Sequence, residues 1–114
     1  MTQDPRRDLS IPLPVRVERA DGSARDEYAV NVSASGLCLH AETPLEIGEE
    51  IRIALRLPCE GAEIQAAAKV VWTRHRGARP PLPRCWETGL SLVEIADADV
   101  ARLAWFVSAQ VDRR

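Results

Sequence analysis

Apolar and polar residues alternate along most of the chain with a period of two, as expected for strands that bury one face. The alternation is clear in segments 13–17, 28–32 and 51–57, and further strand-like runs cover 62–73 and 86–95. We therefore expect short strands in these five segments. Their buried faces should carry Leu13, Val15, Val17, Tyr28, Val30, Val32, Ile51, Ile53, Leu55 and Leu57.

Turn-forming residues separate these runs. Segments 21–23, 33–36, 47–48 and 58–61 each contain a glycine, and most also contain Asp, Ser or Pro. Short strands joined by short loops favour an antiparallel sheet that closes into a barrel or a sandwich.

The end of the chain changes to helical spacing. Apolar residues recur there every three or four positions, which is the stripe of an amphipathic helix. The stripe consists of Val100, Leu103, Ala104, Val107 and Val111. Asp97 or Asp99 can cap the start of this helix. We expect a helix over 97–112 that docks across an open end of the barrel.

The length and composition of the chain limit the classes of protein to which it can belong. The 114 residues are 46% hydrophobic and 28% charged, which is typical of one globular domain. The net charge of −2 argues against a protein that coats DNA or RNA, since that needs a basic surface. There is no apolar run of 18 residues and no signal-like stretch, so we expect a cytoplasmic protein with no membrane contact.

The number and spacing of the cysteines and histidines argue against a metal centre or an enzyme. Cys38, Cys59 and Cys85 form an odd, widely spaced set without a Cys-x-x-Cys pair. Cys38 and His40 are suited to share a strand face, but no second pair completes a tetrahedral site. Neither histidine lies beside a nucleophile motif. We expect no metal, no cofactor and no catalytic residue.

The segment 31–36 reads Asn-Val-Ser-Ala-Ser-Gly and is the most distinctive in the chain. If Val30 and Val32 point inward, Asn31 and Ser33 point outward on one face, about 7 Å apart. Gly36 then permits a positive φ and the close approach of another group. Such a surface suits a polar ligand, and the alternative is a plain Ser/Asn-rich turn.

Arginines in two further segments are candidates for contacting a ligand or partner. Arg6 and Arg7 precede the first expected strand, and a guanidinium can bind guanine or phosphate bidentately. The loop 74–84 carries four arginines and no acid, which suits phosphate or an acidic partner. In both places the alternative is a solvated basic segment. The large aromatics Trp72, Trp86, Trp105 and Phe106 are expected in the core or against the helix.

In their order, these features resemble the PilZ domain family. An arginine-containing segment is followed by Asn31-x-Ser33-x-x-Gly36, by the run 69–72 (Lys-Val-Val-Trp), by Gly89 in the last strand, and by a helix. The resemblance implies an all-β fold, a six-stranded antiparallel β-barrel with one C-terminal α-helix. It implies a single domain with a flexible segment 1–10, a barrel over 11–96 and the helix over 97–112. The implied ligand is the bacterial second messenger cyclic diguanylate (cyclic di-GMP).

The match to the family's two motifs is unequal. Asn31, Ser33 and Gly36 fit the second motif, with Asn in place of the more usual Asp. The Arg-x-x-x-Arg motif is incomplete, because its second arginine falls on Ser10 when counted from Arg6 and on Ile11 when counted from Arg7. Losing one bidentate contact to guanine costs about 1–3 kcal/mol, or roughly 5- to 150-fold in affinity. The resemblance implies ligand contacts from Arg6, Arg7, Asn31, Ser33 and Gly36, with Ser10 or Arg16 as the candidates to substitute for the missing arginine.

Two functions follow from the resemblance. In the first, the domain is a receptor that binds cyclic di-GMP and passes the signal to an unidentified protein partner. In the second, the incomplete arginine motif marks an adaptor that keeps the fold, does not bind the nucleotide and acts by protein–protein interaction.

Overall fold

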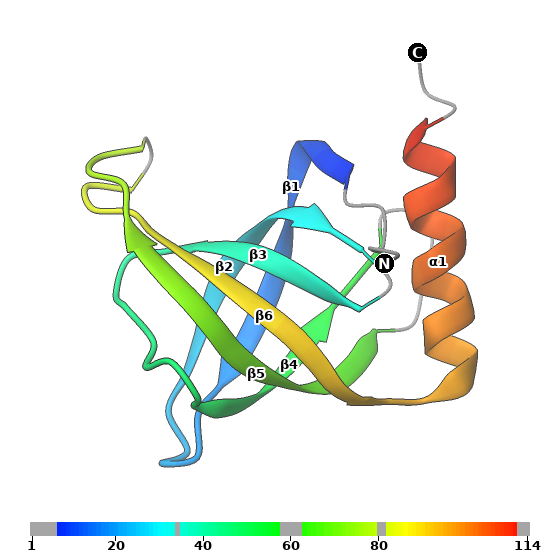
Figure 1. The fold of residues 1–114 in the computed structure, drawn as a ribbon, viewed down its shortest axis with the longest axis horizontal. Helices are drawn as coiled ribbons and strands as arrows, with labels where there is room; N and C mark the ends of the chain where they lie inside the picture. Colours follow the sequence, from blue (N-terminus) through cyan, green and yellow to red (C-terminus); the bar gives the residue numbers. More distant parts are fainter. Residues whose placement is uncertain (1–6, 34, 58–62, 80–81, 112–114) are drawn as a thin grey trace.

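The chain forms a six-stranded β-barrel and one helix (Figure 1). The computed structural model describes residues 7–33, 35–57, 63–79 and 82–111, with side chains described for residues 12–108 of these ranges. The strands are β1 (Arg7–Glu18), β2 (Ala24–Val32), β3 (Gly36–Ala41), β4 (Glu50–Leu55), β5 (Ile64–His75) and β6 (Trp86–Ile95), followed by helix α1 (Asp97–Val111).

The sheet closes on itself in the order β1-β2-β3-β6-β5-β4, and every pairing is antiparallel. The expected all-β barrel with one C-terminal helix is therefore confirmed. β1 begins at Arg7, earlier than the expected start of the barrel at Ile11. The helix begins at Asp97 as expected, and residue 112 lies outside the described residues.

The barrel interior is filled by the apolar positions of the alternating pattern. Leu13, Val15 and Val17 on β1 are at most 4% exposed, and Ile51, Ile53 and Leu55 on β4 are 2% exposed. The turns between strands are also as expected at two glycines, because Gly22 and Gly48 adopt φ angles of +89° and +90°, a conformation that favours glycine.

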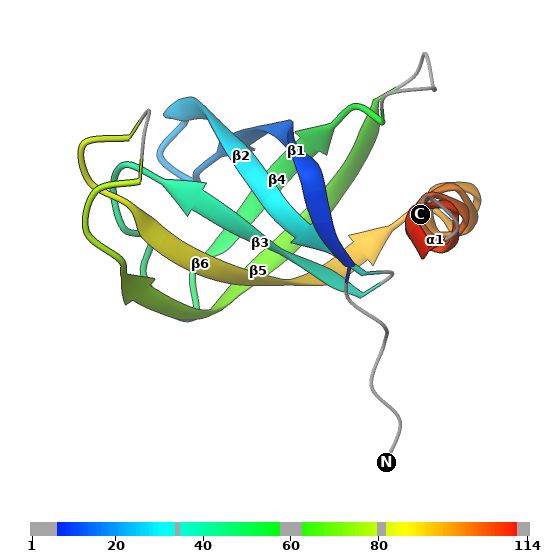
Figure 2. The same cartoon turned by 90° about the horizontal axis from the view of Figure 1, so that it is seen from above.

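Helix α1 closes one end of the barrel, and Figure 2 shows it almost end-on beside the strands. Leu103, Phe106 and Val107 are buried in the same cluster as the barrel core. Ala96 occupies the N-cap position, because its carbonyl accepts the amides of Asp99 and Val100. The two aspartates that were expected as caps, Asp97 and Asp99, lie instead in the first turn of the helix. In the described part of the chain, no helix has the length and apolarity needed to span a membrane.

Tyr28 and Trp105 are exposed, although both were expected to be buried. Trp105 is 63% exposed on the outer side of α1, because the stripe that faces the barrel is completed by Phe106 instead. Tyr28 is 44% exposed, and Val30 is only half-buried. On β2 the inward positions are instead Glu27 and Ala29, until a register shift between Ala29 and Asn31 restores Val32 to the core.

Candidate ligand-binding site

The turn between β2 and β3 is organised by the hydroxyl of Ser33. This side chain is fully buried, so the expectation that it points outward is wrong. Its Oγ accepts hydrogen bonds from the amides of Ser35 (3.3 Å) and Gly36 (3.2 Å), and the Ser33 amide donates to the Gly36 carbonyl (2.8 Å). Ser33 therefore shapes the turn rather than presenting a hydroxyl to a ligand.

Gly36 is required by packing and not by its φ angle. The expected positive φ is wrong, because the glycines with positive φ in the described chain are Gly22, Gly48 and Gly77. A Cβ on Gly36 would overlap the carbonyl oxygen of Leu90 on β6. The close approach allowed by Gly36 is thus between two strands, and the turn is further held by the Leu92 amide, which donates to the Ser35 carbonyl at 2.8 Å.

Asn31 carries an unpaired acceptor beside this turn. Its side chain is half-buried, and its amide oxygen is buried without a hydrogen-bond partner among the described residues. A buried acceptor without a partner is uncommon and costly in a native protein. The oxygen is therefore suited to accept an N–H from a bound molecule.

The start of β1 lies directly beside Asn31. Backbone pairing places Arg7 opposite Val32 and Asp8 opposite Asn31, after which the register is interrupted as far as Leu13. Ser10 falls inside this interruption. The side chains of Arg7 and Ser10 lie outside the described ones, and Arg6 lies outside the described residues altogether. The fold thus brings the backbone of Arg7 and Asp8 next to Asn31, although these residues are distant from Asn31 in the sequence.

A row of residues crosses the outer face of the barrel from Asn31 to Trp72. Asn31 is paired with Cys38, Cys38 with Gly89, and Gly89 with Trp72. Three strand spacings of about 4.8 Å separate the ends of this row, or about 14 Å. The Trp72 indole lies over Gly89, where any Cβ would overlap it. Trp72 is half-exposed on the outer face, so its expected place in the core is wrong.

In the sequence, the only indication that Trp72 lies on the outer face is a glycine, Gly89, on the neighbouring strand. Gly89 leaves a bare stretch of strand on which an indole from the neighbouring strand can lie, but the pairing of Gly89 with Trp72 depends on a register shift between Val70 and Trp72. Such a shift reverses the face of every residue after it. The expectation that Trp72 lies in the core as a large aromatic could not take this shift into account.

A charged cluster borders this row. Glu87 on β6 receives a hydrogen bond from Arg74 at 2.7 Å and lies 3.2 Å from His40 Nε2 and 3.7 Å from Arg76. Burial raises the pKa of Glu87, but the contacts with Arg74, His40 and Arg76 outweigh it and hold this pKa below its ordinary value. Two of the four arginines of segment 74–84 are thus balanced by an acid on the next strand.

The Arg74 guanidinium also lies 5.9 Å from the centre of the Trp72 ring, which is within cation–π range. This contact connects the charged cluster to the row that ends at Trp72. Cys38 and His40 share the outer face of β3, yet the described residues hold no group of three metal-binding side chains. The chemistry available on this face is hydrogen bonding, cationic contact and aromatic stacking.

Comparisons with known proteins give the family and the fold. The PilZ domain model matches residues 2–109. The structure is similar to the Bacillus subtilis inhibitor of motility (MotI/DgrA), with 24% identity and a TM-score of 0.78 over 100% of this chain and 53% of that one. It is also similar to MrkH of K. pneumonia in complex with c-di-GMP, with 17% identity and a TM-score of 0.81 over 97% of this chain and 52% of that one.

A third similar structure is the PilZ domain with c-di-GMP of YcgR from Escherichia coli, with 15% identity and a TM-score of 0.78 over 97% of this chain and 92% of that one. At such identities the likeness is one of fold. This chain spans about half the length of MotI/DgrA and of MrkH. A comparison with curated protein sequences gave no significant match.

Proposed function

This chain belongs to the PilZ domain family, and we propose that it is a receptor that binds cyclic di-GMP on the outer face of the barrel between Asn31 and Trp72. The observation that carries the proposal is the unpaired amide oxygen of Asn31 beside the start of β1. Guanine presents N–H donors that this oxygen can accept. Arg6 and Arg7 supply cationic forks for guanine and phosphate.

The residues of the candidate site divide into two groups. Asn31, Arg6 and Arg7 contact the nucleotide, with Ser10 at the place of the missing second arginine. Ser33 and Gly36 act by position, because one ties the turn together and the other lets β3 approach β6. The side-chain amide of Asn31 therefore keeps a fixed place relative to the strand that carries Arg7.

The alternative function is an adaptor that does not bind the nucleotide. It is favoured by one observation, the absence of an arginine at both positions where the second one of the motif is expected. A hydroxyl at Ser10 cannot form the two parallel bonds that a guanidinium makes. A protein partner would then be recognised without cyclic di-GMP.

Calorimetric titration with cyclic di-GMP tests the proposal and separates it from the alternative. We expect the wild-type protein to bind with a Kd in the micromolar range and not to bind GTP. Ser10→Arg restores an Arg-x-x-x-Arg spacing with Arg6 and should tighten binding by roughly 5- to 150-fold, the value of one bidentate contact to guanine. Ser10→Lys is the matched control, since it adds the same charge without the planar fork, and it should tighten binding less.

Each outcome of the titration is informative. Binding by the wild type supports the receptor. If the folded wild type gives no heat but Ser10→Arg binds, the site is intact and the wild type no longer binds cyclic di-GMP. This is the result that the adaptor function requires. Absence of binding by both proteins would refute a cyclic di-GMP site on this face.

Trp72 provides a second test on the same face. Stacking of a base on an aromatic ring contributes about 1–3 kcal/mol per base, so Trp72→Ala should weaken cyclic di-GMP binding by roughly 5- to 150-fold. Trp105→Ala is the matched control, because Trp105 is 63% exposed on α1 and lies outside the proposed site. Equal affinities of the two variants in the calorimeter would remove Trp72 from the site.

A further inference from the structure

The end of the barrel away from α1 contains a pocket that the nucleotide proposal does not use. Its volume is about 230 Å³, and it is lined by Val17, Arg19, Ser23, Arg25, Glu27, Thr43 and Leu45. These residues belong to the β1–β2 hairpin and to the connection 42–49 between β3 and β4, which lie on the side of the barrel opposite the helix in Figure 1. This volume holds several water molecules or one small organic molecule.

Glu27 faces the inside of the barrel at this pocket. It is paired with Val15 across the β1–β2 ladder, and Arg25 is paired with Val17. Directly opposed residues share a face of the sheet, and both valines belong to the barrel core. Glu27 is 9% exposed. A carboxylate thus occupies a position on β2 that the barrel pattern reserves for an apolar residue.

The Glu27 carboxylate has no hydrogen bond or ion pair in the described part of the chain. Burial raises its pKa, the charge of Arg25 lowers it, and the charges of Glu42 and Asp26 raise it further. Burying such a group without a partner is costly unless a ligand or solvent satisfies it. Glu27 lines the pocket, so a cation that enters the pocket can pair with this carboxylate.

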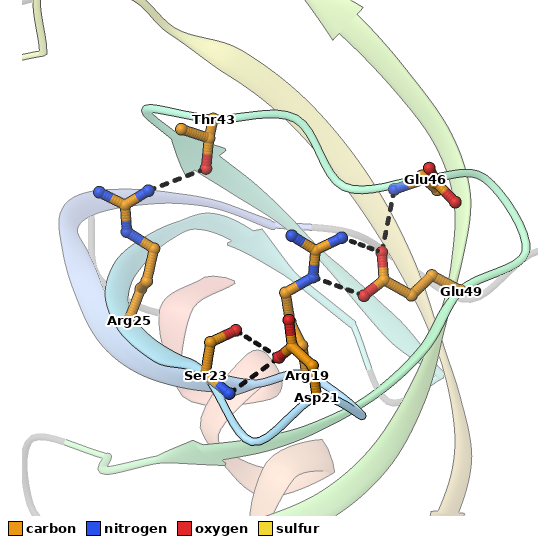
Figure 3. Close-up of polar contacts among 7 residues, drawn as sticks. All are labelled: Arg19, Asp21, Ser23, Arg25, Thr43, Glu46 and Glu49. Carbon is orange, nitrogen blue, oxygen red and sulfur yellow. Dashed lines mark hydrogen bonds and ion pairs between the residues drawn. The ribbon is translucent and has the colours of Figure 1, made fainter.

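The rim of the pocket is held by polar contacts between the hairpin and the connection 42–49 (Figure 3). Arg19 forms a two-bond ion pair with Glu49, at 2.6 and 2.9 Å, and Arg25 donates to Thr43 Oγ1 at 3.0 Å. Glu49 also accepts the amide of Glu46 at 3.1 Å. These contacts preform the rim, while the bond to Thr43 uses one of the five N–H donors of Arg25.

We propose that this pocket binds a small zwitterion of the amino-acid type, with its ammonium group on Glu27 and its carboxylate at Arg25. A buried carboxylate calls for a cation, and the described residues contain no group of three metal ligands that would make that cation a metal. Arg25 repels a ligand that is only cationic and attracts one that also carries an anion. Val17 and Leu45, at 4% and 7% exposed, supply the apolar wall between the two charges.

The test uses three probes with the same number of carbon atoms and different charges: β-alanine, propylamine and propionate. Each is titrated into the wild-type protein and followed by backbone amide NMR. We expect β-alanine to shift the amides of the pocket with a Kd of about 1 mM, ordinary for a ligand of so few atoms. Propylamine should bind more weakly and propionate should leave the pocket unchanged. Absence of pocket shifts with β-alanine, or equal shifts with either other probe, would overturn the proposal.

Glu27→Gln separates a ligand-binding role from a structural one. It removes the charge and keeps the size, so β-alanine binding should weaken by at least about tenfold, while the Tm stays the same or rises because a buried charge has been removed. Glu94→Gln is the matched control, since it makes the same change at an exposed residue of β6 that does not line the pocket, and it should bind β-alanine as the wild type does. Retention of β-alanine binding by Glu27→Gln would contradict the assignment. If Glu27→Gln does not fold, the comparison of the three probes on the wild type decides alone.

Discussion

Gly36→Ala should lower the free energy of unfolding by roughly 2–4 kcal/mol, which is at the upper end for one added methyl group. The reason is that the new Cβ would overlap the carbonyl oxygen of Leu90, a backbone atom that cannot rotate away. Relief requires β3 to move away from β6 at the pair Gly36–Ser91. Thermal unfolding followed by circular dichroism should show a fall in Tm of about 8–20 °C.

Ser35→Ala is the control for this substitution. Ser35 lies in the same turn and is exposed, and its carbonyl rather than its side chain holds Leu92. The Tm of Ser35→Ala should therefore stay within about 2 °C of the wild type, the shift expected for a surface change of at most about 0.5 kcal/mol. Equal Tm values for Gly36→Ala and the wild type would show that β3 and β6 are not as close as described here.

Arg7→Ala should abolish detectable binding of cyclic di-GMP, a loss of about 100-fold or more. With the second arginine of the motif already absent, Arg6 alone would remain to contact base and phosphate. The Tm of the free protein should change little, because Arg7 is the first residue of β1 and pairs with Val32 at the end of the ladder, and strand ends contribute less to global stability than strand centres. Calorimetry gives the affinity, and circular dichroism gives the Tm.

Arg56→Ala controls for the loss of one positive charge. Arg56 is exposed just after β4 and is absent from the row between Asn31 and Trp72. Its replacement should change the affinity less than about twofold at 0.15 M salt, where distant surface charges are screened. Wild-type affinity in Arg7→Ala would refute the role assigned to Arg7, whereas equal losses in both variants would indicate a general effect of charge.

The parts of the fold that follow a simple alternation could be predicted from the sequence. On β1 and β4 every second residue is apolar, and each of these residues with a described side chain is in the core. The helix was also predictable, since the apolar residues recur every second position in the strands but every three or four positions at the end of the chain. The barrel closure and the number of strands came from the resemblance to a family rather than from periodicity. β3 in particular reads Leu-Cys-Leu-His-Ala after Gly36, and its outward Cys38 is itself buried.

The candidate site was predicted less well because it lies where strands depart from regular pairing. A register shift next to Asn31 changed the faces of Tyr28 and Val30, and another next to Trp72 placed that residue on the outside. Register shifts depend on contacts with the neighbouring strand, so alternation along a single strand does not reveal them. The assignment of Asn31, Ser33 and Gly36 to a ligand site stays a prediction, whereas the expected exposure of Ser33 and the expected positive φ of Gly36 are wrong.

Because Ser33 is buried, the serine and glycine of the Asn31-x-Ser33-x-x-Gly36 motif do not by themselves indicate that a chain binds the nucleotide. Ser33 and Gly36 serve the turn and the approach of two strands, so a chain that lost its nucleotide ligand would still need both residues to fold. Selection for the barrel alone would preserve them. Asn31 carries no comparable folding duty, since its amide oxygen has no partner among the described residues. Receptors and adaptors with this fold should therefore be distinguished by the arginine positions and by the residue at Asn31, and not by the serine and glycine.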